Sequence, residues 1–336
     1  MKEHKNKFEY IKFNDDKILA LDSKEGNIQF ISHAHSDHAF AYSKKIKTLC
    51  STETAAIKNF NGNVMDIKEA EKFLNAGLKL LNAGHIFGAK QLHVQSNANS
   101  YDILYTGDIR LSDNIITKGA EITNCEELII DCTYGMKEYT FPKPFEVYEQ
   151  MKKYYEKEKP DIAVFMGYSI GKAQELVKFV NEYLNQIAIV DKYIAKICKI
   201  MNTFGLNLKY LENTSEEGIE MMKKGTYIAV SSPKWNIKRD FHELGQKLNK
   251  KCLTIYTTGW AVNKDLSRLC DKAFPLSDHC DFKELVEFVN LCNPKKVYCK
   301  YGFTKEFANY LRKNGYEAFS IEEEKKLSEQ NICKLF

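Results

Sequence analysis

Three of the eight histidines in this 336-residue chain lie within six residues, in the pattern His33-x-His35-x-Asp37-His38. The pattern follows the apolar run NIQFIS, which predicts a short β-strand. His33 and His35 can point to the same side of the following loop because alternate residues share a face. Asp37 and His38 come after the turn and can reach a neighbouring position. Imidazoles with a carboxylate indicate a transition-metal site that suits zinc best, with iron and manganese as alternatives.

Four further candidates stand where a short apolar run gives way to a polar loop: Asp22, His85, Asp108 and Asp131. Each run has the composition of a strand, and loops at strand ends often carry the catalytic groups of a rigid scaffold. We expect His85 and Asp108 to complete the metal shell, and an aspartate can bridge two ions ~3.5–4 Å apart. Asp22 has two interpretations: it supports the ligand loop from outside the shell, or it caps a turn.

The pattern of the chain changes near residue 140. The predicted elements beyond that point are helices over 143–160 and 171–185 and strands over 162–167, 187–190, 226–232 and 252–259. Alternation of this kind predicts a parallel sheet flanked by helices. After about residue 272 the chain returns to strands that end in polar loops. The sequence therefore predicts a first domain over 1–138, an inserted α/β domain over 139–272 and the rest of the first domain over 273–336.

The composition excludes several classes of protein. No apolar run approaches the ~20 residues that span a bilayer, so we expect no membrane association. The stretch MKEHKNKFEY lacks the apolar run of a signal peptide, so we expect a cytoplasmic location. The ten cysteines include no C-x-x-C pair, which disfavours a zinc knuckle or a thioredoxin-type site. The net charge of +4 permits a polyanionic partner without requiring one.

The histidine cluster, with His85 in AGHIFGA and Asp108 in TGD, resembles the metal motifs of the metallo-β-lactamase superfamily, and Asp22 resembles its first, non-ligating motif. The resemblance implies an α/β fold in which two sheets lie between layers of helices, an αββα sandwich. It also implies two ion sites. The first would be formed by His33, His35, His85 and Asp108. The second would be formed by Asp37, His38 and the shared Asp108.

Three later stretches resemble the β-CASP nuclease branch of that superfamily: DCTYG with Asp131, GYSIGKAQELV, and FPLSDHCDF with His279. They imply that an α/β β-CASP domain is inserted into the sandwich. Within the branch, the chain is most similar to ligase-associated exonucleases and DNA cross-link repair nucleases. It is less similar to RNA 3′-end processing factors and RNase J.

One motif departs from the family. In VYCKYGFT, Tyr301 precedes Gly302 at the position where the family usually carries a histidine ligand to the second ion. A tyrosine is rarely deprotonated at neutral pH, so we expect one or two ions per chain, with the second held weakly. The cross-link repair nucleases also lack this histidine, so its loss need not abolish activity. The alternative is that Tyr301 is a plain structural aromatic.

The chemistry implied is phosphodiester hydrolysis. A metal ion can lower the pKa of a water to ~7 and neutralise charge on the phosphoryl oxygens. Asp37 can accept a proton from the attacking water. His279, placed by the resemblance, would protonate the leaving oxygen or steady the phosphate, and Asp131 would orient its ring.

A phosphate pocket is predicted where GYSIGKAQE opens a helix. The predicted groups are Ser169, Gly171 and Lys172, because free N–H groups at a helix start favour an anion. The alternative is an ordinary helix start followed by a solvated lysine. SSPKWNIKRD mixes Trp235 with basic residues, which suits either contact with a single strand or a solvated loop.

We therefore expect a zinc-dependent nuclease that acts on single-stranded DNA or RNA or on strand ends. We expect exonuclease action, which a narrow cleft favours. Two alternatives remain: a metallo-hydrolase of small esters or thioesters, and a non-catalytic nucleic-acid-binding paralogue. The inserted domain disfavours the first alternative, and the otherwise complete metal set disfavours the second.

Overall fold

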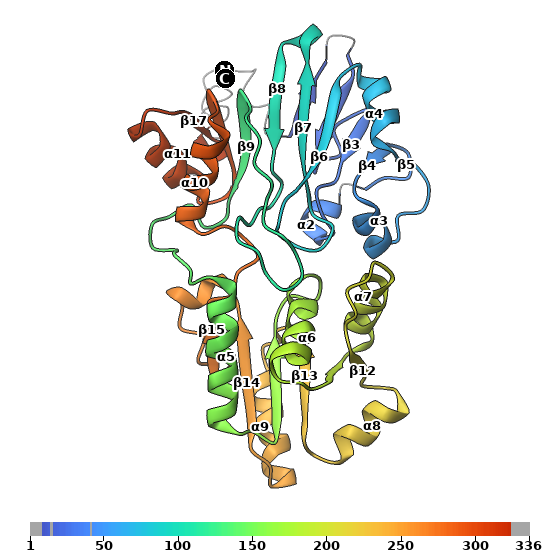
Figure 1. The fold of residues 1–336 in the computed structure, drawn as a ribbon, viewed down its shortest axis with the longest axis vertical. Coiled ribbons are helices and arrows are strands. Elements are labelled where there is room, and N and C mark those ends of the chain that lie inside the picture. Colours follow the sequence, from blue (N-terminus) through green and yellow to red (C-terminus); the bar gives the residue numbers. More distant parts are fainter. Residues whose placement is uncertain (1–8, 14–15, 41, 324–336) are drawn as a thin grey trace, which may run out of the picture. The chain divides into compact units, whose positions relative to one another are not determined.

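The computed structural model describes residues 9–13, 16–40 and 42–323. The chain forms two compact units (Figure 1). Unit 1 comprises residues 1–111, 119–139 and 279–336, and unit 2 comprises residues 112–118 and 140–278. Residues 273–278, which the sequence assigned to the first domain, therefore lie in unit 2. The identity of unit 2 as an inserted β-CASP domain stays a prediction.

Unit 1 contains two β-sheets among its described residues. The first sheet has the strand order β1 (Tyr10–Lys12), β2 (Ile18–Leu21), β3 (Ile28–Phe30), β4 (Lys47–Leu49) and β5 (Val64–Met65). The second has the order β17 (Glu317–Ser320), β16 (Lys296–Gly302), β9 (Glu127–Cys132), β8 (Tyr101–Tyr105), β7 (Lys90–Ser96) and β6 (Gly77–Asn82). The pairs β1–β2, β6–β7 and β7–β8 are antiparallel, and the other neighbours are parallel.

The two sheets of unit 1 pack face to face over a common apolar core. Leu21 and Phe30 of the first sheet lie in one buried cluster with Leu92, Ile103 and Ile129 of the second. Alternate residues of each strand face this core, as the two-residue period of a strand requires. The helices and short helical turns of unit 1 are α2 (Ser36–Ala39), α3 (Thr52–Lys58), α4 (Ile67–Leu74), η1 (Asn97–Asn99), α10 (Phe282–Cys292) and α11 (Thr304–Lys313). Helix α4 contacts β6, α10 contacts β9, and α11 contacts β16 and β17.

Unit 2 contains one fully parallel sheet among its described residues. Its strand order is β12 (Tyr210–Glu212), β11 (Ala188–Val190), β13 (Tyr227–Ser231), β10 (Ile162–Met166), β14 (Cys252–Thr257) and β15 (Lys272–Phe274). The helical elements are α5 (Pro144–Glu158), α6 (Lys172–Tyr183), α7 (Lys192–Thr203), α8 (Glu216–Lys223), α9 (Ile237–Leu248) and η2 (Gly259–Val262). The predicted α/β class and the predicted parallel sheet are both confirmed.

Local sequence explains several helix starts. The helices α3, α4, α7, α8 and α10 begin after a cap residue whose side chain accepts a hydrogen bond from the N–H three residues on: Ser51, Asp66, Asp191, Ser215 and Asp281. Such caps satisfy an N–H group that the helix itself leaves unpaired. No helix among the described residues is long and apolar enough to cross a membrane.

Candidate metal centre

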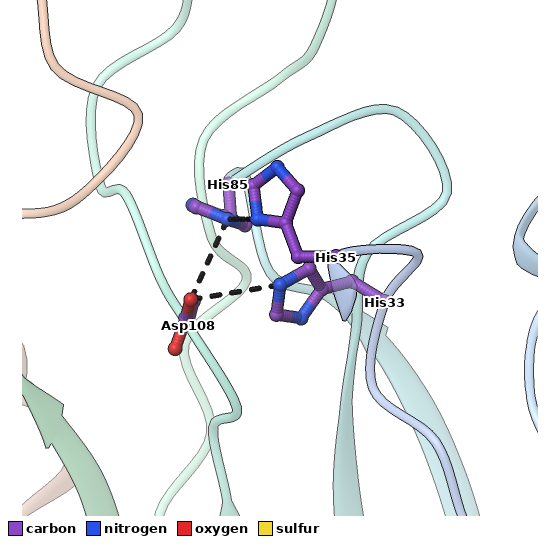
Figure 2. A group of neighbouring side chains, drawn as sticks. All are labelled: His33, His35, His85 and Asp108. Carbon is purple, nitrogen blue, oxygen red and sulfur yellow. Dashed lines mark hydrogen bonds and ion pairs between the residues drawn. The ribbon is translucent and has the colours of Figure 1, made fainter. Parts of the chain in front are cut away.

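The four residues predicted to hold the first ion come together in unit 1. His33 and His35 lie between β3 and α2, His85 follows β6, and Asp108 follows β8. One ligand atom of each lies within 4.8 Å of those of the other three. Figure 2 shows the three imidazoles and the carboxylate turned toward one another. Their convergence is observed, and their role as metal ligands stays a prediction.

The donor atoms of this group fit a transition-metal ion. His35 Nδ1 lies 3.0 Å from His85 Nε2. Asp108 Oδ2 lies 3.5 Å from the Nε2 atoms of both His33 and His85. His33 Nε2 is buried and has no hydrogen-bond partner in the described part of the chain. A buried nitrogen left unpaired is costly, and a cation among these atoms would remove that cost.

Burial sets the protonation of two of these groups. Burial, followed by the nearby His38 and His85 rings, lowers the pKa of His33 well below its usual value, so the ring is neutral. A histidine must be neutral to bind a metal ion. Burial also raises the pKa of Asp108 to about 6, although His38 opposes the shift. A cation beside Asp108 would favour its anionic form.

Asp22 is buried and holds the ligand loop in place. Its carboxylate accepts hydrogen bonds from the Ser32 N–H at 2.7 Å and the Ser32 hydroxyl at 2.6 Å. It also pairs with His38 Nδ1 and accepts from the Tyr105 hydroxyl, each at 2.7 Å. Burial by itself would raise the pKa of Asp22, but His38 and the Lys300 ammonium lower it. Of the two interpretations, these contacts favour support of the ligand loop.

The predicted second ion site is less compact. His38 Nε2 lies 3.4 Å from Asp108 Oδ1 and 3.9 Å from Asp37 Oδ2. The Asp37 side chain is 80% exposed, whereas His38 is buried. Burial by itself would lower the pKa of His38, but Asp108 and Asp22 raise it to about 10. The surroundings of His38 therefore attract positive charge, and the binding of a second ion stays a prediction.

Tyr301 lies beside His38, with the two ring centroids 4.9 Å apart. Its hydroxyl is 3.3 Å from the Tyr105 hydroxyl. Burial, together with the Asp22 charge, raises the pKa of Tyr301 well above its usual value, so the phenol stays protonated at neutral pH. The backbone here is tight, because Tyr301 has a φ of 64° and a Cβ on Gly302 would lie 2.3 Å from the Thr133 Cα. A protonated phenol is a poor ligand, which supports the expectation of a weak second site.

Replacing Tyr301 with histidine is expected to raise the affinity of the second site for its metal ion. The wild type should bind one ion that resists mild chelation and another that titrates in at higher metal concentration. Calorimetric titration of zinc into both proteins measures the two affinities without an activity assay. Tyr301→Phe is the matched control, because it keeps the ring and removes only the hydroxyl. Two equal, tight affinities in the wild type would show that another group replaces the missing histidine.

His279 is held by Asp131 next to the metal cluster. Its Nδ1 atom lies 2.8 Å from Asp131 Oδ2, and its Nε2 atom lies 3.9 Å from Asp108 Oδ2. The Thr133 N–H and hydroxyl donate to the other Asp131 oxygen at 2.8 and 2.6 Å. The N–H of Cys280 donates to the Ile109 carbonyl at 2.7 Å, which joins the two loops that carry His279 and Asp108. The His279 side chain is 21% exposed, so this pair can reach a substrate.

The position of His279 is also compatible with a role as a metal ligand. Asp108, Asp131 and His279 each offer a ligand atom within 4.8 Å of the other two. The role of His279 as an acid and that of Asp131 as its orienting partner stay predictions.

Lys172 is not an open phosphate ligand in this structure. Its ammonium is buried and binds Glu175 and, at 2.8 Å, Asp278, all within unit 2. The Tyr148 hydroxyl donates to the same Glu175 carboxylate. The alternative made from the sequence, a solvated lysine, is therefore wrong, and a phosphate contact by Lys172 stays a prediction. The motif could not reveal this pair, because Asp278 lies 106 residues further along the chain.

The other two residues of the predicted pocket also have internal partners. The Ser169 and Ser232 hydroxyls form a hydrogen bond. The Gly171 N–H donates to Gln174 Oε1 at 2.8 Å, and Gly171 has a φ of 91° that favours glycine. These contacts fix the loop before α6, and phosphate binding by Ser169 and Gly171 stays a prediction.

Lys172→Ala is expected to destabilise the protein by roughly 3–5 kcal/mol, because it leaves two buried carboxylates without their cation. Urea unfolding measures this change. Lys196→Ala, on the exposed face of α7, is the control and should stay within about 0.5 kcal/mol of wild type. Equal stability of all three proteins would mean that Glu175 and Asp278 do not depend on the lysine.

Sequence reasoning missed several residues that support the site. Ser32 and Tyr105 bind Asp22, and Thr133 binds Asp131. Lys300 is buried, and its ammonium lies 5.1 Å from the Tyr105 ring centroid and donates to the Leu21 carbonyl. The available signal was a lysine inside the apolar run VYCKYG, since a charged residue is seldom buried without a partner.

Comparison with known proteins finds curated relatives and a solved structure of the same fold. No family model matches the chain. A probable DNA ligase of Opitutus terrae is 30% identical over 89% of this chain, which spans 29% of that protein. The probable RNase MJ4 of Methanocaldococcus jannaschii is 27% identical over 60% of this chain and 55% of its own length. The human DNA cross-link repair 1A protein is 25% identical over 80% of this chain and 27% of its own length.

A crystal structure from Enterococcus faecalis V583, of a protein of unknown function, has the same fold. It aligns with a TM-score of 0.58 and 14% identity over 87% of this chain and 78% of its own. The two-sheet unit with its histidine and aspartate cluster defines a metallo-β-lactamase-like protein. The chain belongs to the metallo-β-lactamase superfamily and to its β-CASP branch. It spans less than two thirds of each of the curated relatives named above.

Proposed function

We propose that this protein is a zinc-dependent nuclease that hydrolyses phosphodiester bonds in single-stranded DNA or RNA, working from strand ends. The relatives include a probable RNase and a DNA cross-link repair protein. The observation that carries the proposal is the position of the His279–Asp131 pair, 3.9 Å from the carboxylate of the four-residue cluster. In this proposal His279 is the proton-transfer group, and it lies beside a site whose donors fit a cation.

The residues have distinct tasks in this proposal. The ions, when bound by the cluster, would supply positive charge for the phosphoryl oxygens and acidify a water molecule. Asp37, with its exposed carboxylate, accepts a proton from the attacking water. Asp131 accepts from His279 Nδ1, so in the doubly protonated ring Nε2 is the nitrogen that donates a proton to the departing oxygen. Asp22 orients the His38 ring through the hydrogen bond to His38 Nδ1.

We also propose that unit 2 is the inserted β-CASP domain and that the chain lies near the ligase-associated and cross-link repair nucleases. The match to a probable DNA ligase over 29% of that protein supports this placement. Ester or thioester hydrolysis and non-catalytic nucleic-acid binding are the alternatives. The buried metal-type cluster and the ordered His279 pair disfavour the non-catalytic alternative.

A side-by-side digestion tests the proposal. Zinc-reconstituted protein is given 5′- and 3′-end-labelled single-stranded DNA and RNA, circular single-stranded DNA and a thioester. We expect progressive shortening of the linear strands, no cleavage of the circle and no thioester hydrolysis. Thioester turnover with intact strands, or binding of strands without any cleavage, would contradict the proposal. Cleavage of the circular strand would support nuclease activity but contradict the proposal that the protein works from strand ends.

A further inference from the structure

The loops at the carboxyl edge of the unit 2 sheet flank a topological switch point. β10 and β14 are neighbours in the sheet. The chain leaves β10 through α6 toward β11 on one side, and it leaves β14 through η2 toward β15 on the other. In parallel α/β sheets, ligands bind outside the carboxyl ends of strands at the point where the connections diverge in this way.

An aromatic residue follows each of the three central strands at this edge. Tyr168 comes two residues after β10, Trp235 four residues after β13, and Trp260 three residues after β14. Trp235 is 74% exposed and Tyr168 is 51% exposed. The two tryptophans are the only ones in the chain. Core packing does not account for large rings that remain this exposed.

Hydrogen bonds join the loop after β10, which carries Tyr168, to the loop after β13, which carries Trp235. The Gly167 N–H donates to the Ser231 carbonyl at 3.1 Å, and the Ser169 and Ser232 hydroxyls are bonded. The residues on both sides of Tyr168 are thus held by hydrogen bonds, while half of the Tyr168 surface stays open. Little order would therefore have to be gained on binding.

Cations accompany the exposed rings. Lys234 precedes Trp235 and is exposed, and the Lys264 ammonium lies 3.9 Å from the Trp260 ring centroid. Lys238, by contrast, is held by Asp271 at 3.3 Å and by two backbone carbonyls. Two exposed lysines, Lys234 and Lys264, therefore stand next to the tryptophans, and their charge matches the phosphates of a nucleic acid strand.

We infer that this edge of unit 2 is a stacking surface for unpaired bases, with Tyr168 and Trp235 as the rings that take them and Lys234 and Lys264 beside the phosphates. The inference rests on the proposed function and specifies how that function would hold its substrate. Stacking on aromatic rings tolerates any base, so the surface would select single strands rather than a sequence.

Binding of phosphorothioate-linked oligothymidylate, which resists cleavage, to the zinc-loaded protein tests the inference. The readouts are fluorescence anisotropy of a labelled strand and quenching of tryptophan emission. Trp235→Ala and Tyr168→Ala should each weaken binding roughly tenfold or more. Tyr168→Phe should bind nearly as well as wild type because it keeps the ring. Phe204→Ala removes another exposed aromatic, at the end of α7, and should change nothing.

A strand of the same length without bases separates stacking from charge. The wild type and Trp235→Ala should bind this abasic strand equally. If Trp235→Ala also binds the abasic strand more weakly than the wild type does, the contact is not stacking and the inference is overturned. If both alanine variants bind oligothymidylate like wild type while the wild type still digests DNA or RNA, the inference fails and the proposed function stands. If the wild type neither binds nor digests any strand, both fail.

Discussion

Replacing Asp108 with asparagine is expected to release the metal ion and abolish hydrolysis while leaving the fold intact. Asp108 lies within 3.5 Å of a ring nitrogen in each of three histidines, His33, His38 and His85. Asparagine keeps the shape of the side chain and removes the charge that balances a cation. Loss of such a ligand should exceed the ~10- to 100-fold loss in affinity or activity that removing an outer partner costs.

Elemental analysis of protein never exposed to chelator checks this expectation. The wild type should carry at least one equivalent of zinc or a similar ion, and the variant less than about a tenth, because binding depends on a deprotonated ligand set. Asp102→Asn is a matched control. Asp102 also pairs with a histidine, His93, at 2.6 Å, but it lies at the far end of β8 from Asp108. A wild type without metal even after reconstitution would remove the basis of the proposed chemistry.

The convergence of the metal-type cluster could be foreseen because it depends on local pattern. His33, His85 and Asp108 each follow an apolar run, and the runs became strands β3, β6 and β8. Strands that pair in a sheet bring their ends close together, so polar residues just beyond those ends meet. The predicted runs that became β2, β9, β10, β11, β13 and β14 are likewise confirmed, and the strands expected after about residue 272 are β15, β16 and β17.

Contacts between distant segments could not be foreseen. Strands β4, β5 and β12 were not predicted from the sequence, and each is a short segment that pairs with a neighbouring strand of its sheet. Buried Lys172 is paired with Asp278, and the hydrogen bond that Tyr105 makes to Asp22 joins residues 83 positions apart. A motif gives the residue types of a site, whereas these long-range partners decide whether a side chain is open to substrate.

His279→Ala is expected to lower the rate of phosphodiester hydrolysis by ~10²–10⁴-fold, the usual worth of general acid–base catalysis, while the protein keeps its metal ion. The reason is geometric. Asp131 holds His279 Nδ1 at 2.8 Å, and the other ring nitrogen lies 3.9 Å from Asp108 with part of the ring exposed. Asp131→Asn should give a smaller loss, because it disturbs the orientation of the ring without removing it, and Asp131→Glu should restore part of the rate.

A substrate with a nitrophenolate leaving group distinguishes an acid from a phosphate-binding or ligand role. Nitrophenolate departs without a proton, so His279→Ala should lose far less activity on a nitrophenyl phosphodiester than on an oligonucleotide. Equal losses on both substrates would mean that His279 steadies the phosphate instead of protonating the leaving oxygen. Loss of the ion from His279→Ala would instead make His279 a metal ligand, a role that its position within 4.8 Å of ligand atoms from Asp108 and Asp131 permits.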